Sequence, residues 1–86
     1  MWIVMAWTET RREPIDTHAT RVDLGERPTF VEVQRPLAVV WVRNGTDEDV
    51  AKCRRHADAQ DNGALVFTYP ASEPDPIGRA KSDVMP

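Results

Sequence analysis

The chain has little of several things that would indicate a particular chemistry. It contains one cysteine, Cys53, so an internal disulfide is excluded and a reducing, cytoplasmic setting is expected. Its four glycines are scattered at turns, which leaves no glycine-rich loop to hold a phosphate group. The basic surplus of non-specific nucleic-acid binders is also missing, because the formal net charge is −3.

Long hydrophobic runs are absent as well. The apolar segment at residues 1–7 has no basic residue before it and is too short for a signal-peptide core or a membrane span. We therefore expect neither a targeting segment nor a transmembrane segment, and no membrane partner. Hydrophobic residues make up 41% of the 86 residues and charged residues 29%, which is typical of a small globular domain with a thin stability margin.

What the chain does have is a strand–helix–strand pattern between residues 37 and 67. The segment Leu37–Val42 is apolar at every position, so both of its faces favour burial and it is predicted to be a central strand. A buried helix is the competing interpretation. The run is too short for it, because Pro36 precedes the segment and the Asn44-Gly45 pair follows.

A helix is predicted to begin at Thr46, whose hydroxyl can cap the free amides of the first turn. Three acidic residues follow, at the end of the helix where the macrodipole favours negative charge. Gly63, after Asn62, is expected to end the helix as a left-handed C-cap. The apolar side of this helix is a narrow stripe with helical spacing, formed by Val50, Cys53 and Ala57.

Four further strands and one turn complete the predicted elements. Trp2–Thr8 is apolar on both faces and reads as a second central strand, and the charged segment Glu9–Pro14 reads as a turn. Ile15–Leu24 suits a weak edge strand, and Thr29–Gln34 alternates between apolar and polar residues. Ala64–Tyr69 is predicted to be the last strand.

These elements predict an α+β fold: a single-layer, mainly antiparallel sheet of four to five strands with one packed helix, in the order β-β-β-β-α-β. We expect residues 1–70 to form this domain. Residues 71–86 are rich in proline and polar side chains, and are expected to be an extended or disordered arm. Ile77 would anchor the arm if it crossed a neighbouring surface.

Catalytic chemistry has weak support. Cys53 and His56 are three positions apart on the predicted helix, close enough to share a metal or a proton, but Cys53 lies on the apolar stripe and reads as a packing residue. A zinc site would need more ligands, and His18 is the only other good one. We assign no catalytic, cofactor-binding or metal-binding residue and expect no cofactor and no enzymatic activity. A thiol or metal enzyme that uses Cys53 is a distant alternative.

A nucleic-acid-binding regulator is the nearer alternative. Basic residues on and before the predicted helix could follow a phosphate backbone, although acidic residues on the same helix would repel it. The candidate residues for this function are Arg43, Lys52, Arg54 and Arg55.

The leading hypothesis comes from the sheet. Two strands are apolar on both faces, and one thin helix covers only one face, so a second copy, the C-terminal arm or another protein must cover the other. We therefore expect a non-catalytic, protein-binding module that docks onto another protein and modulates or inhibits it, and a homodimer as the simplest assembly. Small acidic chains of this kind are typical of accessory factors, including those of phages and mobile elements. The interface candidates are Trp2, Val4, Trp7, Val39, Trp41 and Ile77.

Overall fold

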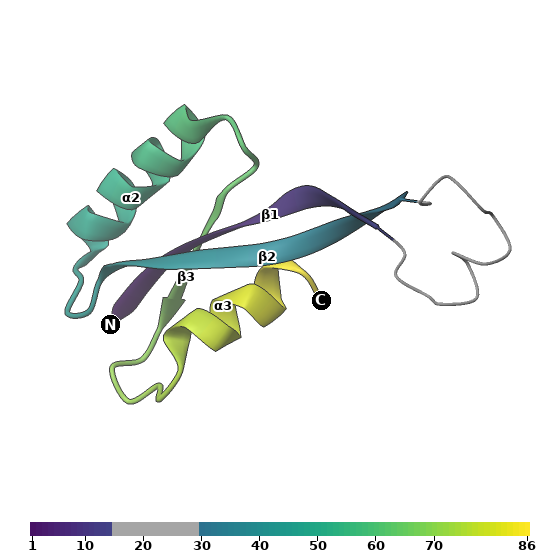
Figure 1. Ribbon diagram of the computed structural model, residues 1–86. Helices are drawn as coiled ribbons and strands as arrows, with labels where there is room; N and C mark the ends of the chain where they lie inside the picture. Colours follow the sequence, from purple (N-terminus) through teal and green to yellow (C-terminus); the bar gives the residue numbers. More distant parts are fainter. Residues whose placement is uncertain (15–29) are drawn as a thin grey trace, which may run out of the picture.

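The computed structural model describes residues 1–14 and 30–86, which form an α+β fold. Its strands and helices follow in the order β1 (Trp2–Pro14), β2 (Phe30–Val42), α2 (Asp47–Gln60), β3 (Leu65–Tyr69) and α3 (Pro76–Val84). The three strands form one antiparallel sheet in the order β2-β1-β3, so that β1 pairs with both of the others (Figure 1).

The sheet lies between the two helices, with α2 on one face and α3 on the other (Figure 1). Successive side chains of β1 point to opposite faces: Ile3 and Met5 pack in a cluster with α2, while Val4 and Ala6 pack in a cluster with α3. The two-sided apolar pattern of Trp2–Thr8 therefore predicted a central strand correctly. This strand supplies the core on both faces.

Helix α2 begins as the sequence predicts. Thr46 is the N-cap, and its hydroxyl accepts a hydrogen bond from the Asp49 amide while the Asp49 carboxylate accepts one from the Thr46 amide at 2.9 Å. The predicted stripe of Val50, Cys53 and Ala57 is buried against the sheet.

The end of α2 differs from the prediction by two residues. The left-handed C-cap is Asp61, with φ 53°, rather than Gly63. Gly63 also has a left-handed backbone, with φ 73°, but it lies in the loop that leads to β3. An aspartate tolerates this conformation better than most residues because its short side chain can hydrogen-bond locally.

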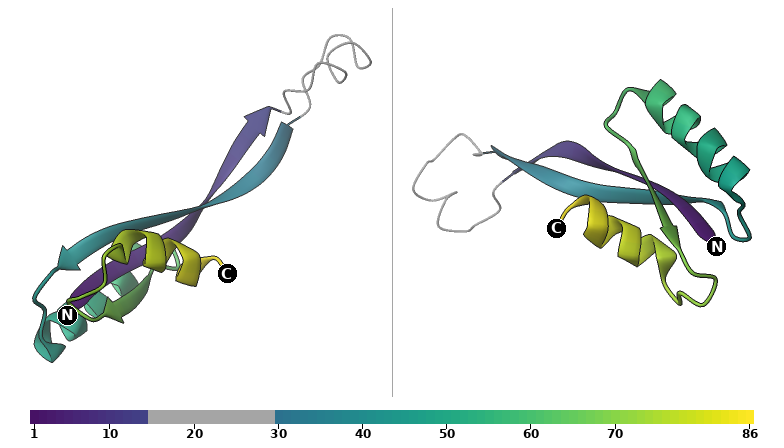
Figure 2. Two further views of the ribbon diagram at one scale, coloured as in Figure 1. Left: turned by 90° about the horizontal axis from the view of Figure 1, so that it is seen from below. Right: turned by 180° about the vertical axis from the view of Figure 1, so that it is seen from behind.

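The segment Glu9–Pro14 is not a turn, and this prediction was wrong. β1 continues through it and pairs residue by residue with β2, from Thr8 opposite Pro36 to Pro14 opposite Phe30. Paired strands of this kind accept charged side chains when both faces are solvated, and the Glu13 carboxylate contacts the Arg35 guanidinium across the pair. We call this two-stranded extension, residues 9–14 of β1 and 30–35 of β2, the β1–β2 ribbon. It runs beyond the helices (Figure 2). The predicted weak strand Ile15–Leu24 lies outside the described residues.

Thr29–Gln34 and Leu37–Val42 were predicted as separate strands, but residues 30–42 form the single strand β2. The strand passes through Pro36 without a break. Proline lacks the N–H that a strand donates to its neighbour, and it is tolerated where that side of the strand has no neighbour. β2 is an edge strand of the sheet, which explains the proline and corrects the prediction that Leu37–Val42 is central.

The predicted C-terminal arm is instead helix α3, so the chain has two packed helices and the order β-β-α-β-α in the described residues. The Asp75 carboxylate caps this helix by accepting a hydrogen bond from the Gly78 amide at 3.0 Å, and Pro76 starts its first turn. Ala80 is buried against the sheet, and the Tyr69 hydroxyl donates a hydrogen bond to the Asp83 carboxylate at 2.7 Å. The segment folds back and covers the second face of the sheet. Neither α2 nor α3 is long and apolar enough to cross a membrane.

Candidate protein interface

The two helices are displaced towards opposite edges of the sheet. Helix α2 packs on β1 and β3, whereas α3 packs mainly on β1 and β2. Each face of the sheet therefore has one edge strand that its helix covers only in part. On the α2 side this strand is β2, and on the α3 side it is β3, where Tyr69 packs against α3 but the Leu65 side chain is 52% exposed.

Apolar side chains gather on the uncovered side of β2. Trp7 pairs with Leu37 and Met5 with Val39, which places these side chains on the same sheet face as α2. The register shifts near Val40, and the ring of the adjacent Trp41 lies 5.1 Å from the ring of His56 on α2. Val39 is 43% exposed and Trp41 is 40% exposed. We call this surface the β2 strip; its members are Trp7, Leu37, Val39 and Trp41.

Two arginines lie on β2 or directly after it, before and after the apolar segment that carries the β2 strip. No aspartate or glutamate occurs between Val33 and Thr46, and this stretch contains Arg35 and Arg43. Arg43 lies over the ring of Trp2, with its guanidinium carbon 5.2 Å from the ring centroid. Arg35 is paired with the Glu13 carboxylate of β1, and Arg43 packs with Trp2 on the α3 side of the sheet, so the described residues do not place a free cationic group at both ends of the β2 strip.

The structure brings three of the six predicted interface residues together. Trp7, Val39 and Trp41 all belong to the β2 strip. Val4 is fully buried beneath α3, and Ile77 is half-buried in the first turn of α3. Trp2 also packs on the α3 side. Its indole N–H is buried without a hydrogen-bond partner in the described part of the chain.

Sequence reasoning missed two exposed or half-exposed leucines. Leu37 shares the alternation of Val39 and Trp41, so that pattern was a usable signal for it. Leu65 is exposed because α3 packs mainly on β1 and β2, and no local pattern in the sequence predicts where a helix packs.

Cys53 is a packing residue in the structure, as its place on the apolar stripe predicted. It is 0% exposed, and burial raises the pKa of its thiol, which keeps the sulfur protonated and a poor nucleophile. The His56 ring lies on the exposed side of α2 against Trp41. Within residues 1–14 and 30–86, no group of three or more histidine, cysteine or acidic side chains is placed to hold a metal ion.

The basic residues proposed for nucleic-acid binding do not lie in one patch. Arg43 is over Trp2, and the Lys52 ammonium lies 3.4 Å from the Glu48 carboxylate on the exposed side of α2. Arg54 projects towards β3 beside Asp58, and Arg55 is exposed on the helix. Acidic groups therefore accompany Lys52 and Arg54, and would weaken contact with a phosphate backbone.

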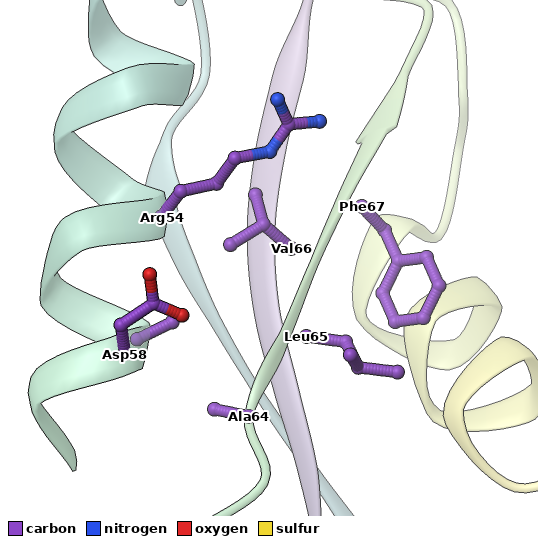
Figure 3. Close-up of a pocket in the computed structure, with 7 residues that line it drawn as sticks. Arg54, Asp58, Ala64, Leu65, Val66 and Phe67 are labelled. Atoms are coloured by element: carbon purple, nitrogen blue, oxygen red, sulfur yellow. The ribbon is translucent and has the colours of Figure 1, made fainter. Parts of the chain in front are cut away.

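A shallow groove of about 350 Å³ lies between α2 and β3 (Figure 3). Arg54 and Asp58 stand on its helix side, Val66 points towards α2, and Leu65 and Phe67 point towards the α3 side of the sheet. The two charged groups have opposite signs and no nucleophile accompanies them among the lining residues. The groove therefore shows no arrangement for a defined reaction.

Comparison with protein-family models, with curated proteins and with solved structures gave no match for this chain.

Proposed function

We propose that the chain is a non-catalytic, protein-binding module that docks onto another protein through the β2 strip and modulates it. The observation that supports this proposal is the exposure of Val39 and Trp41 on the side of β2 that α2 leaves largely uncovered. Tryptophan is enriched among the residues that dominate binding energy, because its large side chain fills a pocket in the partner.

The strip is also held in place before any partner arrives. Leu37 and Val39 belong to a continuous ladder with β1, and the Trp41 ring rests against His56. A surface that is already ordered loses little conformational freedom on binding, so more of its contact energy contributes to affinity.

Affinity purification from the source cells tests the proposal. The wild-type chain is expected to retain a protein in stoichiometric amount, and the Val39→Lys and Trp41→Ala variants are expected to lose it. Val31→Lys is the matched control, because Val31 is exposed on the same face of β2 but lies out on the β1–β2 ribbon. Equal retention by all three variants would contradict the proposal.

The homodimer expected from the sequence stays a prediction, but its original reason has changed. It was based on a sheet face without a cover, and α3 covers that face. In the present structure a second copy would have to use the β2 strip. Static light scattering on the full chain distinguishes self-association from binding to another protein.

A further inference from the structure

Asparagine occurs twice in the chain, and glycine follows it both times: Asn44-Gly45 lies between β2 and α2, and Asn62-Gly63 lies between α2 and β3. We propose that Asn62 is a site of spontaneous deamidation in the folded protein, and that the fold protects Asn44 from the same reaction. Asn62 precedes β3, the edge strand opposite β2, so the modification is independent of the function proposed for the β2 strip.

Deamidation of asparagine begins when the backbone nitrogen of the following residue, after losing its proton, attacks the side-chain carbon Cγ. A new C–N bond closes a succinimide ring, and the side-chain nitrogen leaves as ammonia. Water then opens the ring at one of its two carbonyl carbons, which gives either aspartate or isoaspartate. The net change is one water molecule taken up and one ammonia released. A following glycine favours ring closure because it has no Cβ to hinder the approach.

The loop between α2 and β3 leaves this reaction open at Asn62. Both Asn62 and Gly63 are exposed, and the Gly63 amide makes no backbone hydrogen bond among the described residues. A Cβ added at Gly63 would meet nothing within 4 Å apart from its chain neighbours, so no packed group holds this residue in place. The attacking nitrogen can therefore lose its proton to solvent and turn towards the side chain without breaking a contact.

The side chain of Asn62 is folded back onto the main chain. Its Oδ1 accepts a hydrogen bond from the Ala64 amide at 3.1 Å, which closes an Asx-turn around Gly63. A donor at this oxygen polarises the C=O bond and stabilises the negative charge that the oxygen acquires when Cγ is attacked. The hydrogen bond thus keeps the carboxamide near the attacking nitrogen and makes its carbon more electrophilic.

Asn44 has the same neighbour in a different setting. The Gly45 amide donates a hydrogen bond to the Met1 carbonyl at 2.9 Å, and a Cβ added at Gly45 would overlap the Ile3 side chain. Before the Gly45 nitrogen can attack Asn44, it must give up this hydrogen bond and leave its packed position. A local opening of the chain between β2 and α2 therefore has to precede the reaction, which slows it.

Conversion at Asn62 changes the connection between α2 and β3. The product has a carboxylate beside Asp61, at the end of α2 where the macrodipole disfavours negative charge, and the last turn of this helix contains no basic residue. Isoaspartate also routes the main chain through the former side chain and so lengthens the connection by one methylene group. We expect the isoaspartyl form to melt at a lower temperature than the Asn62→Asp variant, which carries the added charge alone.

Peptide mapping by mass spectrometry tests the proposal on the full chain. The protein is incubated at mildly alkaline pH, and the exchange of NH₂ for OH is followed over time at both asparagines. Folded protein is expected to convert Asn62 at least roughly tenfold faster than Asn44, because the hydrogen bond and packing of Gly45 must be lost first. In urea the two sites should convert at similar rates, since both have the same following residue. A higher pH should speed conversion of Asn62, because the attacking nitrogen must lose its proton.

Two variants separate the sites. Gly63→Ala hinders ring closure and should slow conversion of Asn62, in the folded chain and in urea, without changing the rate at Asn44. Asn44→Gln is the matched control and should leave conversion of Asn62 unchanged. Circular dichroism checks that both variants remain folded.

Equal rates at the two asparagines in the folded protein, or faster conversion of Asn44, would overturn the proposal. Conversion of Asn62 in urea but not in the folded chain would show that the loop protects this residue, and no conversion in either state would exclude the reaction. Equal melting temperatures of the isoaspartyl form and the Asn62→Asp variant would reject the effect on the α2–β3 connection.

Discussion

Gly45 occupies the most crowded backbone position between β2 and α2. A Cβ atom added there would overlap the Ile3 side chain and lie 2.8 Å from Cγ1 of Val42, and the Gly45 amide donates a hydrogen bond to the Met1 carbonyl at 2.9 Å. The glycine therefore allows the chain to pass close to β1 before α2 begins. Its neighbours are in the core, so a side chain would have to displace packed atoms.

Gly45→Ala is expected to reduce the free energy of unfolding by about 1–3 kcal/mol, the usual cost of overpacking a core. Urea denaturation measures this change. Gly63→Ala is the matched control: Gly63 has a left-handed backbone but nothing within 4 Å of its added Cβ, so only backbone strain of about 1 kcal/mol is expected. If Gly45→Ala reduced the free energy of unfolding less than Gly63→Ala, the inference that Gly45 is tightly packed would be wrong.

Tyr69 makes stability depend on pH at the alkaline end. Burial, and then the hydrogen bond that its hydroxyl donates to Asp83, raise the pKa of this phenol well above its usual value. The folded state thus favours the neutral form, while the unfolded chain ionises near about pH 10. The stability that Tyr69 contributes by staying neutral in the folded state is fully present below that pH. It is lost as the pH rises through the pKa of the folded state.

We therefore expect the free energy of unfolding to fall as the pH rises above about 10. Tyr69→Phe should flatten this part of the profile. The chain has one tyrosine, so tyrosinate absorbance also reports the ionisation of this residue directly. An identical alkaline profile in the wild type and in Tyr69→Phe would show that other groups cause the loss.

At the scale of the element, α3 is the part whose structure the sequence suggested least. Pro76 and the spacing of Ile77, Ala80 and Val84 are compatible with a short amphipathic helix, but the surrounding prolines and polar residues favour disorder. Nine residues rarely form a stable helix without tertiary contacts. The contact with Val4, Ala6 and Tyr69 of the sheet stabilises this one.

The cap of α3 provides a test. Gly78→Val should reduce stability by about 1 kcal/mol, because a Cβ at Gly78 would meet the Asp75 carboxylate that caps the helix. From the sequence alone we expect no effect of this substitution, because Gly78 then belongs to a disordered arm. Ser82→Ala, at an exposed position of α3, is the control and should leave the melting temperature nearly unchanged. No effect of Gly78→Val would argue against a folded α3.

Elements with a strong local signal were predicted well. The two-faced strand of Trp2–Thr8 and the helix with its cap at Thr46 and its stripe through Cys53 depend on neighbouring residues only. The wrong predictions concern segments whose structure depends on residues far away in the sequence. Glu9–Pro14 is a strand because β2 lies beside it, and Leu37–Val42 is an edge strand because no further strand joins it among the described residues. For the same reason only some of the predicted interface residues lie together on one surface. The positions of the two helices on the sheet determine which apolar residues are exposed.

At the scale of the whole molecule, the β2 strip should determine whether copies of the chain associate. A homodimer would have to bury Val39 and Trp41, whose side chains are 43% and 40% exposed. We therefore expect Val39→Lys to self-associate more weakly than the wild-type chain, as measured by sedimentation equilibrium. Equal association of both proteins would show that copies do not meet at this strip.

The central position of β1 also has a consequence for synthesis on the ribosome. β1 is made before the other described elements: its two neighbours in the sheet begin at Phe30 and Leu65, and α3 ends at Val84. Its apolar side chains are therefore covered on both faces only after β3 and α3 have been synthesised. Until then β1 is an exposed apolar strand in the nascent polypeptide, the kind of segment that favours aggregation during folding.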